Sequence, residues 1–411
     1  MKQVKPVHVM QTQFSTVEGE LQLGGMSIRR LAQRVGSTPF FAYDRQAMTN
    51  RVAHVRSHLP REILLHYSLK ANPMPAVVQH MAGLVDGLDV ASGGELKIAL
   101  DTPVTPAKIS FTGPGKTDAE LAQAIAAGIV INLESAGELR RIDRLANACG
   151  VQANVMVRVN PDFELKSSGM KMAGGAKQFG VDAEQVPALM KELAAANVEL
   201  HGFQIYSGSQ NLKSDAIIEA QTKTFELALA LSADAPVTPR LINIGGGFGI
   251  PYFPGELPLD IAPIGQHLQY WVNQLATRLP GMRIATEMGR YLVGEAGVYI
   301  TRIVDKKMSR GQVFLITDGG MNHHLAASGN LGQVIRKNYP VVIATKMYPD
   351  VKEVTSITGP LCTPLDLLAD RMELAHADVD DLVAVFQSGA YGLTASPTDF
   401  LGHARPKEIV V

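Results

Sequence analysis

The chain has 411 residues, of which 46% are hydrophobic, and this length and apolar content predict two domains with a large buried core. Its net charge of −1 gives no electrostatic basis for binding nucleic acid or an anionic membrane. We find no N-terminal signal segment, no membrane-length apolar stretch and only two cysteines. The sequence therefore predicts a cytoplasmic protein without disulfides.

Short apolar runs alternate with amphipathic helical patterns through the first part of the chain. The runs predict strands at 64–70, 86–90, 108–112, 128–132, 153–159, 199–206, 241–245 and 283–287. Between them, apolar residues recur at i, i+3, i+4 and i+7, which predicts a helix in each crossover. Eight alternating units predict a (β/α)8 TIM barrel, an α/β fold.

The pattern changes to β-rich runs from about residue 296. These runs are VYITRIV, QVFLITDGG, EVTSITG and DLVAVFQSG, with turn residues between them. The early segment TPFFAYD, at 38–44, also predicts a strand, so we expect the N-terminal region to pair with the C-terminal domain. The predicted domains are a barrel at 44–295 and a β-rich domain, a second barrel, formed by 1–43 and 296–411.

Chemically useful residues gather at the predicted C-terminal ends of the barrel strands, where TIM barrels place their active sites. They are Lys70, Asp89, Arg158, Tyr206, Ser209, Gly246, Gly247, Glu287, Gly289 and Arg290. A positioned, partly desolvated lysine can carry an aldehyde cofactor, and glycines after the last two strands expose N–H groups that bind phosphate.

Many short motifs along the chain together resemble one known family. They are YSLKAN, DVASGGEL, FTGPGKT, VRVNPD, MKMAGGAKQFGVD, GSQ, NIGGGFGIPYF, EMGRYLV, DGGMNHH, GPLCTPLD and SGAYG. Through them the chain resembles the fold-type III pyridoxal phosphate decarboxylases, which include diaminopimelate, ornithine and arginine decarboxylases. It is similar in particular to the exosortase-associated pyridoxal-dependent decarboxylases and to a branch that acts on an amino acid tethered to an acyl-carrier protein. The resemblance implies an alanine racemase-like barrel, pyridoxal 5′-phosphate and amino-acid decarboxylation.

The resemblance also implies roles for individual residues. Lys70 would hold the cofactor as a Schiff base, Glu287 would contact the pyridine nitrogen, and Cys362 would return a proton to the decarboxylated carbon. The phosphate would be bound by Ser209, Gly246, Gly247, Gly289, Arg290 and Tyr391. Asp89 and Arg158 would lie behind the cofactor. The substrate would contact Arg290, Arg336, Cys362, Thr363 and Tyr391.

The family pattern implies a homodimer with shared active sites, because the cysteine there comes from the partner chain. Two positions depart from that pattern. Tyr206 stands where most members have a histidine stacked on the cofactor, so the ring face is still covered but without the histidine's proton chemistry. Thr363 replaces the glutamate with which diaminopimelate decarboxylases read the distal amino group. We therefore expect another amino acid as substrate, free or carrier-linked.

The segment 163–178 follows the fifth predicted strand and is rich in glycine, serine and lysine, which predicts a lid at the barrel mouth. Its lysines Lys166, Lys171 and Lys177 would suit the acidic surface or the phosphate of a carrier protein. No metal site is predicted, since His323 and His324 are adjacent and lack the spacing of a helical zinc pair.

Two other functions are compatible with a lysine-bound cofactor on a barrel. One is an amino-acid racemase of the same fold, against which Glu287 and the GPLC motif count, because such racemases commonly use an arginine at the ring nitrogen. The other is a non-catalytic protein that binds pyridoxal phosphate. Such proteins are typically a lone barrel, and the second domain with Cys362 and Tyr391 argues against this alternative.

Overall fold

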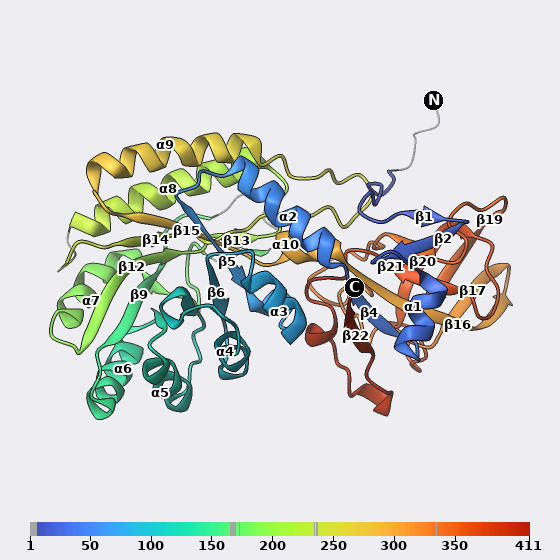
Figure 1. Cartoon of the computed structure of the whole chain (residues 1–411), viewed down its shortest axis with the longest axis horizontal. Coiled ribbons are helices and arrows are strands. Elements are labelled where there is room, and N and C mark those ends of the chain that lie inside the picture. The colour runs from blue at the N-terminus through green and yellow to red at the C-terminus, as the bar shows by residue number, and fades with distance from the viewer. Residues whose placement is uncertain (1–5, 165–169, 172, 234, 236, 334) are drawn as a thin grey trace. The chain divides into compact units, whose positions relative to one another are not determined.

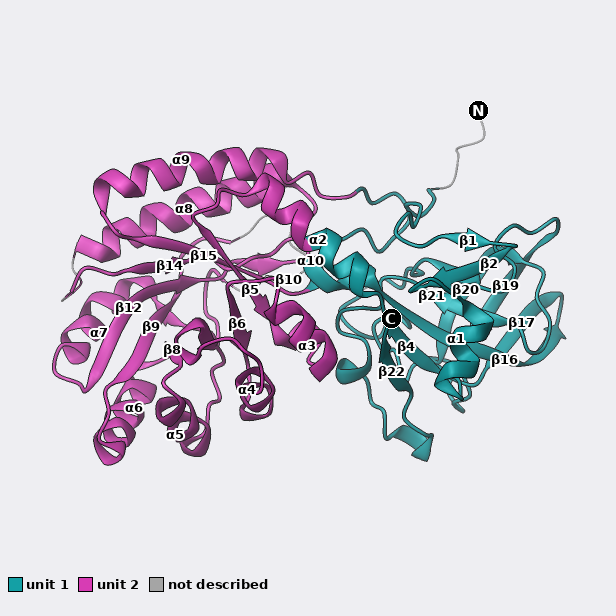
Figure 2. Cartoon of the chain, in the orientation of Figure 1, with its two compact units in different colours: residues 1–51, 250–257, 290–411 teal, residues 52–249, 258–289 magenta. Residues whose placement is uncertain are grey.

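The computed structural model describes residues 6–164, 170–171, 173–233, 235, 237–333 and 335–411. The chain forms two compact units, which Figure 2 distinguishes by colour. We call residues 52–249 and 258–289 the barrel unit, and residues 6–51, 250–257 and 290–411 the β-rich unit. The domain limits expected from the sequence at residues 44 and 296 stay a prediction.

The barrel unit contains a closed parallel sheet. Within the described residues its eight strands are β5 (Ile63–Ser68), β6 (Gly87–Val90), β7 (Ile109–Phe111), β8 (Val130–Leu133), β9 (Ala153–Asn160), β12 (Val198–Ile205), β14 (Leu241–Asn243) and β15 (Arg283–Met288). Pairing of β15 with β5 and of β8 with β9 closes the cylinder. The predicted TIM barrel is thus confirmed. Three further short strands are β10 (Met170–Lys171), which pairs with β13 (Gly208–Ser209), and β11 (Val181–Asp182), which pairs with β9.

Helices lie outside the barrel strands (Figure 1). They are α3 (Pro75–Ala82), α4 (Gly93–Leu100), α5 (Asp118–Ala127), α6 (Ala136–Cys149), α7 (Val186–Leu193), α8 (Ser214–Ala233) and α9 (Ala262–Arg278). Short loops end in a hydroxyl that caps the next helix: Ser92 for α4, Thr117 for α5 and Ser135 for α6. Each hydroxyl accepts a hydrogen bond from an otherwise unpaired helix N–H group. The strand ends are therefore held at defined positions.

The β-rich unit is built around a mixed sheet. Its strands are β1 (Thr16–Val17), β2 (Glu20–Leu23), β3 (Met26–Ser27), β4 (Phe40–Tyr43), β16 (Gly297–Ser309), β17 (Gln312–Thr317), β18 (Val341–Ile343), β19 (Lys352–Thr358), β20 (Leu367–Ala375), β21 (Leu382–Val385) and β22 (Lys407–Val410). Its helices are α1 (Ile28–Val35) and α10 (Arg290–Val293), while α2 (Arg45–His58) contains the limit between the units.

The N-terminal strand β4 pairs with both β16 and β22, so the expected pairing of the N-terminal region with the C-terminal domain is confirmed. Buried side chains from both regions share one core, among them Leu21, Leu31, Phe40, Val298 and Ala384. Removal of this apolar surface from water stabilises the unit although its sequence is discontinuous. Among the described residues, no helix has the length and apolar character needed to cross a membrane.

Candidate active site

Lys70 lies at the C-terminal mouth of the barrel. The sequence placed it at the end of a strand, but β5 ends at Ser68 and Lys70 occupies the 3-10 turn Leu69–Ala71 that follows. Its Nζ is 5.5 Å from the ring centroid of Tyr206, the residue directly after β12. The structure therefore brings together two residues that are distant in the sequence, with the Lys70 amine over the face of the Tyr206 ring.

Two buried carboxylates accompany this lysine. Asp89 is 1% exposed and Glu287 is 4% exposed. Asp89 accepts hydrogen bonds from Ser110 Oγ at 3.0 Å and Thr112 Oγ1 at 2.7 Å. Burial raises the pKa of Asp89, and the charge of Lys70 opposes that shift. Burial, reinforced by the charge of Asp89, raises the pKa of Glu287 to about 8, again opposed by Lys70.

A glycine loop follows β14 and packs closely on the end of β15. The Glu287 N–H donates to the Gly245 carbonyl oxygen at 2.8 Å, and a Cβ at Gly246 would lie only 1.9 Å from the Glu287 carbonyl oxygen. Gly247 has a φ of +91°, in the region that favours glycine. Its carbonyl oxygen accepts from the N–H of Asn211 at 2.9 Å. The loop that follows Ser209 thus lies beside the glycine loop.

The turn containing Gly289 lies next to the turn that carries Lys70. A Cβ at Gly289 would be 2.8 Å from the Cβ of Ala71 and 3.2 Å from the Ser68 carbonyl oxygen. A larger residue would push these two turns apart. The residues at the ends of β5, β12, β14 and β15 therefore lie close to one another, and the roles expected of them stay a prediction.

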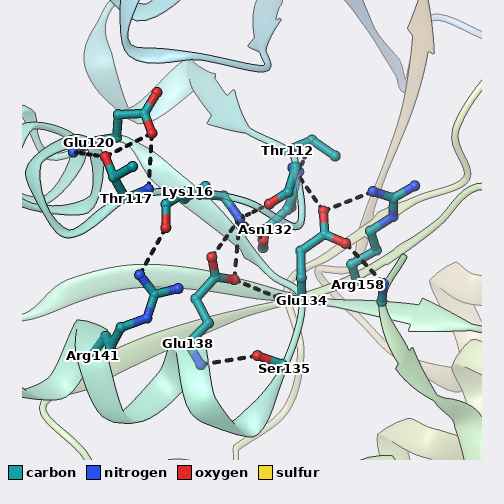
Figure 3. Close-up of polar contacts among 12 residues, drawn as sticks. Thr112, Lys116, Thr117, Glu120, Asn132, Glu134, Ser135, Glu138, Arg141 and Arg158 are labelled. Carbon is teal, nitrogen blue, oxygen red and sulfur yellow. Dashed lines mark hydrogen bonds and ion pairs between the residues drawn. The ribbon is translucent and has the colours of Figure 1, made fainter. Parts of the chain in front are cut away.

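Arg158 belongs to a buried polar network at the ends of β7, β8 and β9 (Figure 3). Its Nη1 donates to Glu134 Oε1 at 2.8 Å, and its guanidinium lies 4.8 Å from the ring centroid of Phe179. Glu134 also accepts from the N–H groups of Gly113 and Gly180, at 2.8 and 2.9 Å. Glu134 therefore connects Arg158 to the segments that carry Gly113 and Gly180. Its expected place behind the cofactor stays a prediction.

Arg290 and Tyr391 meet within the β-rich unit. The Arg290 guanidinium lies 4.5 Å from the ring centroid of Tyr391 and 5.4 Å from that of Tyr252, and its Nη1 donates to the Tyr252 hydroxyl at 2.9 Å. Tyr391 has a φ of 54°, which is uncommon for a residue with a Cβ and is often found at functional sites.

Cys362 and Thr363 lie on the loop between β19 and β20, and Cys362 is exposed. The buried carboxylate of Asp366 anchors this loop. It accepts from the N–H of Leu361 at 2.8 Å and from the N–H of Met321 at 2.6 Å. Two hydrogen bonds to a buried charged group restrain the backbone on which the thiol is carried.

Arg336 is engaged within its own unit. Its Nε donates to the Ser328 carbonyl oxygen at 3.0 Å, its Nη1 to Asn338 Oδ1 at 2.7 Å and its Nη2 to the Leu367 carbonyl oxygen at 2.7 Å. These contacts brace the chain around residues 328–338. Binding of a substrate carboxylate by Arg336 stays a prediction, as does the lid. Residues 165–169 and 172 of that segment, Lys166 among them, lie outside the described residues.

Several residues of the site received no role from the sequence. Asp366 stood within a quoted motif, and Glu134 directly follows a strand, which is a usable signal. Gln204 and Asn243, which contact Glu287, are single polar residues inside otherwise apolar strand segments, FQI and INI. Polar residues at such positions indicate a polar barrel interior. No group of side chains in the described part of the chain could hold a metal ion.

A family model described as the pyridoxal binding domain of pyridoxal-dependent decarboxylases matches residues 45–294. The L-glutamyl-(BtrI acyl-carrier protein) decarboxylase of Niallia circulans is 38% identical over 396 residues, covering 95% of this chain and 92% of the relative. Diaminopimelate decarboxylase of Aquifex aeolicus is 33% identical, covering 92% and 88%. The crystal structure of diaminopimelate decarboxylase from M. jannaschii in co-complex with L-lysine has a TM-score of 0.87 at 27% identity, covering 98% and 93%.

The chain therefore belongs to the pyridoxal-dependent decarboxylases. It is an enzyme that decarboxylates an amino acid with pyridoxal 5′-phosphate, and the relatives above do not support the racemase or the non-catalytic alternative. The described residues fit this cofactor. The barrel mouth offers an amine for its aldehyde, two buried carboxylates suited to a protonated ring, and a closely packed glycine loop.

Proposed function

We propose that this decarboxylase acts on an amino acid tethered to an acyl-carrier protein and that free meso-diaminopimelate is a poor substrate. The main support is the 38% identity, over nearly the whole chain, to a decarboxylase named for a carrier-linked glutamyl substrate. Thr363 supports the expectation that free meso-diaminopimelate is a poor substrate. It is neutral, and its Oγ1 accepts a hydrogen bond from the N–H of Leu365 at 3.3 Å, so it offers no charge to a distal ammonium group.

The residue roles are part of this proposal. When bound, pyridoxal phosphate supplies an electron sink for the negative charge left at Cα as CO2 departs. Lys70 would hold the cofactor at its aldehyde carbon through the side-chain amine, and Glu287 would keep a proton on the ring nitrogen. The Cys362 thiol then gives a proton to Cα. The support is chemical: an amine beside two buried carboxylates, and an exposed thiol on an anchored loop.

The remaining roles concern binding and orientation. The phosphate is held by Ser209, Gly246, Gly247, Gly289, Arg290 and Tyr391. Arg290, Arg336, Cys362, Thr363 and Tyr391 contact the substrate. The cation-π contact between Arg290 and Tyr391 supports a joint role for these two, because it fixes the guanidinium in one direction.

We expect the holoenzyme to decarboxylate an amino acid joined to the carrier through its side-chain carboxyl as a thioester, which leaves the α-carboxylate free to depart as CO2, far faster than the corresponding free amino acid. CO2 release would be compared for L-glutamate linked to an acyl-carrier protein through its side-chain carboxyl, for free L-glutamate, for free meso-diaminopimelate and for carriers loaded with other amino acids that keep a free α-carboxylate. Intact-mass measurement of the carrier would show the loss of one CO2. The matched control is a carrier loaded with the same amino acid whose α-amino group is blocked as an amide. Efficient turnover of free meso-diaminopimelate would contradict the proposal.

We also propose a homodimer in which Cys362 acts in the partner's site. Lys70 belongs to the barrel unit and Cys362 to the β-rich unit, and the exposure of the thiol in the single chain leaves it accessible to a second copy. An isologous dimer would then build two composite sites.

Subunit mixing tests the shared site. Lys70→Ala and Cys362→Ala homodimers should each be nearly inactive, whereas reassortment at equal amounts should restore about a quarter of wild-type activity. Half the dimers are then mixed, and each mixed dimer carries one intact site. Differential tags would verify the exchange. No recovery despite verified exchange would show that Cys362 serves its own chain.

A further inference from the structure

Two amide side chains contact the Glu287 carboxylate inside the barrel. Gln204 on β12 places its Nε2 at 3.2 Å from both carboxylate oxygens, and Asn243 on β14 places its Nδ2 at 2.5 Å from Oε1. Gln204 and Asn243 are direct partners in the parallel pairing of β12 and β14, and each is 1% exposed. The three polar side chains therefore form one water-excluded cluster.

The orientation of the Asn243 amide follows from its second contact. Its Oδ1 accepts from the N–H of Gly245 at 2.9 Å, and a backbone N–H can only donate. The Nδ2 group must therefore face Glu287. The Gly245 carbonyl oxygen in turn accepts a hydrogen bond from the Glu287 N–H at 2.8 Å. Residue 287 is therefore joined to the glycine loop twice, once by this backbone bond and once through the Asn243 side chain.

In this arrangement the Asn243 Nδ2 and Gln204 Nε2 groups donate to the carboxylate, and donated hydrogen bonds favour its charged form. They oppose the burial and the charge of Asp89, which raise the pKa of Glu287. Without these donors, a carboxyl in this position would be neutral over a wider pH range. A neutral carboxyl would not hold the proton on a ring nitrogen, whereas a protonated ring beside Glu287 would itself favour the charged carboxylate, in the same direction as the two donors.

We propose that Gln204 and Asn243 are positioning residues that hold the Glu287 carboxylate charged and fixed toward the barrel mouth, and that Asn243 couples it to the glycine loop. The inference deepens the proposed function, because it rests on the role of Glu287 at the ring nitrogen. Neither residue needs to contact the substrate. They act on the reaction by controlling the charge and the orientation of the Glu287 side chain.

Isosteric variants test this role. Asn243→Asp keeps the acceptor for Gly245 but replaces the donor with a negative charge, and Gln204→Met keeps the shape but removes the donor. Each should lower kcat by about 10- to 100-fold, the effect of losing a hydrogen bond to a charged group, with a smaller change in KM. The acidic limb of the pH–rate profile should move to higher pH, because the pKa of Glu287 rises further.

The visible absorption of the bound cofactor, titrated against pH, provides a readout that a purely structural role would not move. Gln204→His retains an N–H donor and should recover much of the loss. Asn154→Asp is the control. Asn154 lies near the N-terminal end of β9, where its side chain bonds to the Gly128 carbonyl oxygen and to His201. It makes the same isosteric charge change away from the site.

Unchanged kcat and an unchanged pH profile in both Asn243→Asp and Gln204→Met would overturn the inference. So would an equal loss in Gln204→His, which would indicate a packing requirement instead of a donor. If Glu287→Gln itself kept full turnover, the proposed role of Glu287 would fail. If Glu287→Gln lost activity but the amide variants did not, only the positioning role would fail.

Discussion

Replacement of Lys70 by alanine should abolish turnover, with a loss of at least about a thousandfold, and should remove the visible absorption of a lysine-bound cofactor. The amine at the barrel mouth is the group that attaches the aldehyde, and alanine supplies no nucleophile. Lys70 is also the cation that lies among two buried carboxylates. Its removal would take away a positive charge that favours the charged form of both carboxylates.

Borohydride reduction followed by peptide mass analysis measures the attachment directly. Wild-type protein should carry the reduced cofactor on the peptide that contains Lys70, and the alanine variant should carry none. Lys97→Ala, at an exposed position on α4, is the matched control and should behave as wild type. A reduced adduct on another lysine in the Lys70→Ala variant would refute the assignment.

Replacement of Glu287 by glutamine should leave cofactor binding largely intact and lower kcat by about two to four orders of magnitude. Glutamine keeps the shape but cannot keep a proton on the ring nitrogen as a carboxylate does. The direct contacts of the glycine loop with residue 287 are made by the backbone, so the substitution leaves them in place. Cofactor affinity by fluorescence titration and CO2 release would separate binding from chemistry. Near wild-type turnover would exclude the role.

The same substitution should also change how the stability of the cofactor-free protein depends on pH. The pKa of Glu287 is raised from 4.5 to about 8, so the folded chain binds more protons than the unfolded chain within that window. The free energy of unfolding should therefore fall as pH rises through it, and glutamine should remove this dependence. Urea unfolding of both proteins at the two ends of the window measures the difference. Parallel pH dependences would contradict the shift.

The alternation of strands and helices was readable from sequence because it depends on local patterns. A period of two or of 3.6 residues reports which side of an element is apolar, and the eight strands of the closed barrel appear where those patterns predicted them, whereas the short strands β10, β11 and β13 were not predicted. The barrel rule then placed Lys70, Tyr206 and Glu287 at one mouth without any contact being known. Even so, the strand carrying Lys70 ended two residues early, in a 3-10 turn.

What only the tertiary structure decided is which side chains touch. Gln204 and Glu287 are 83 residues apart, and their contact depends on the register of β12, β14 and β15 in the closed barrel. A shift of one residue in that register would turn Gln204 or Asn243 to the outer face. The contacts of Arg336 within its own unit, and those of Asp366 with the loop of Cys362, likewise depend on how segments distant in the sequence pack. Local patterns fix the direction of a side chain relative to its own element, whereas its partner is fixed by how distant elements pack.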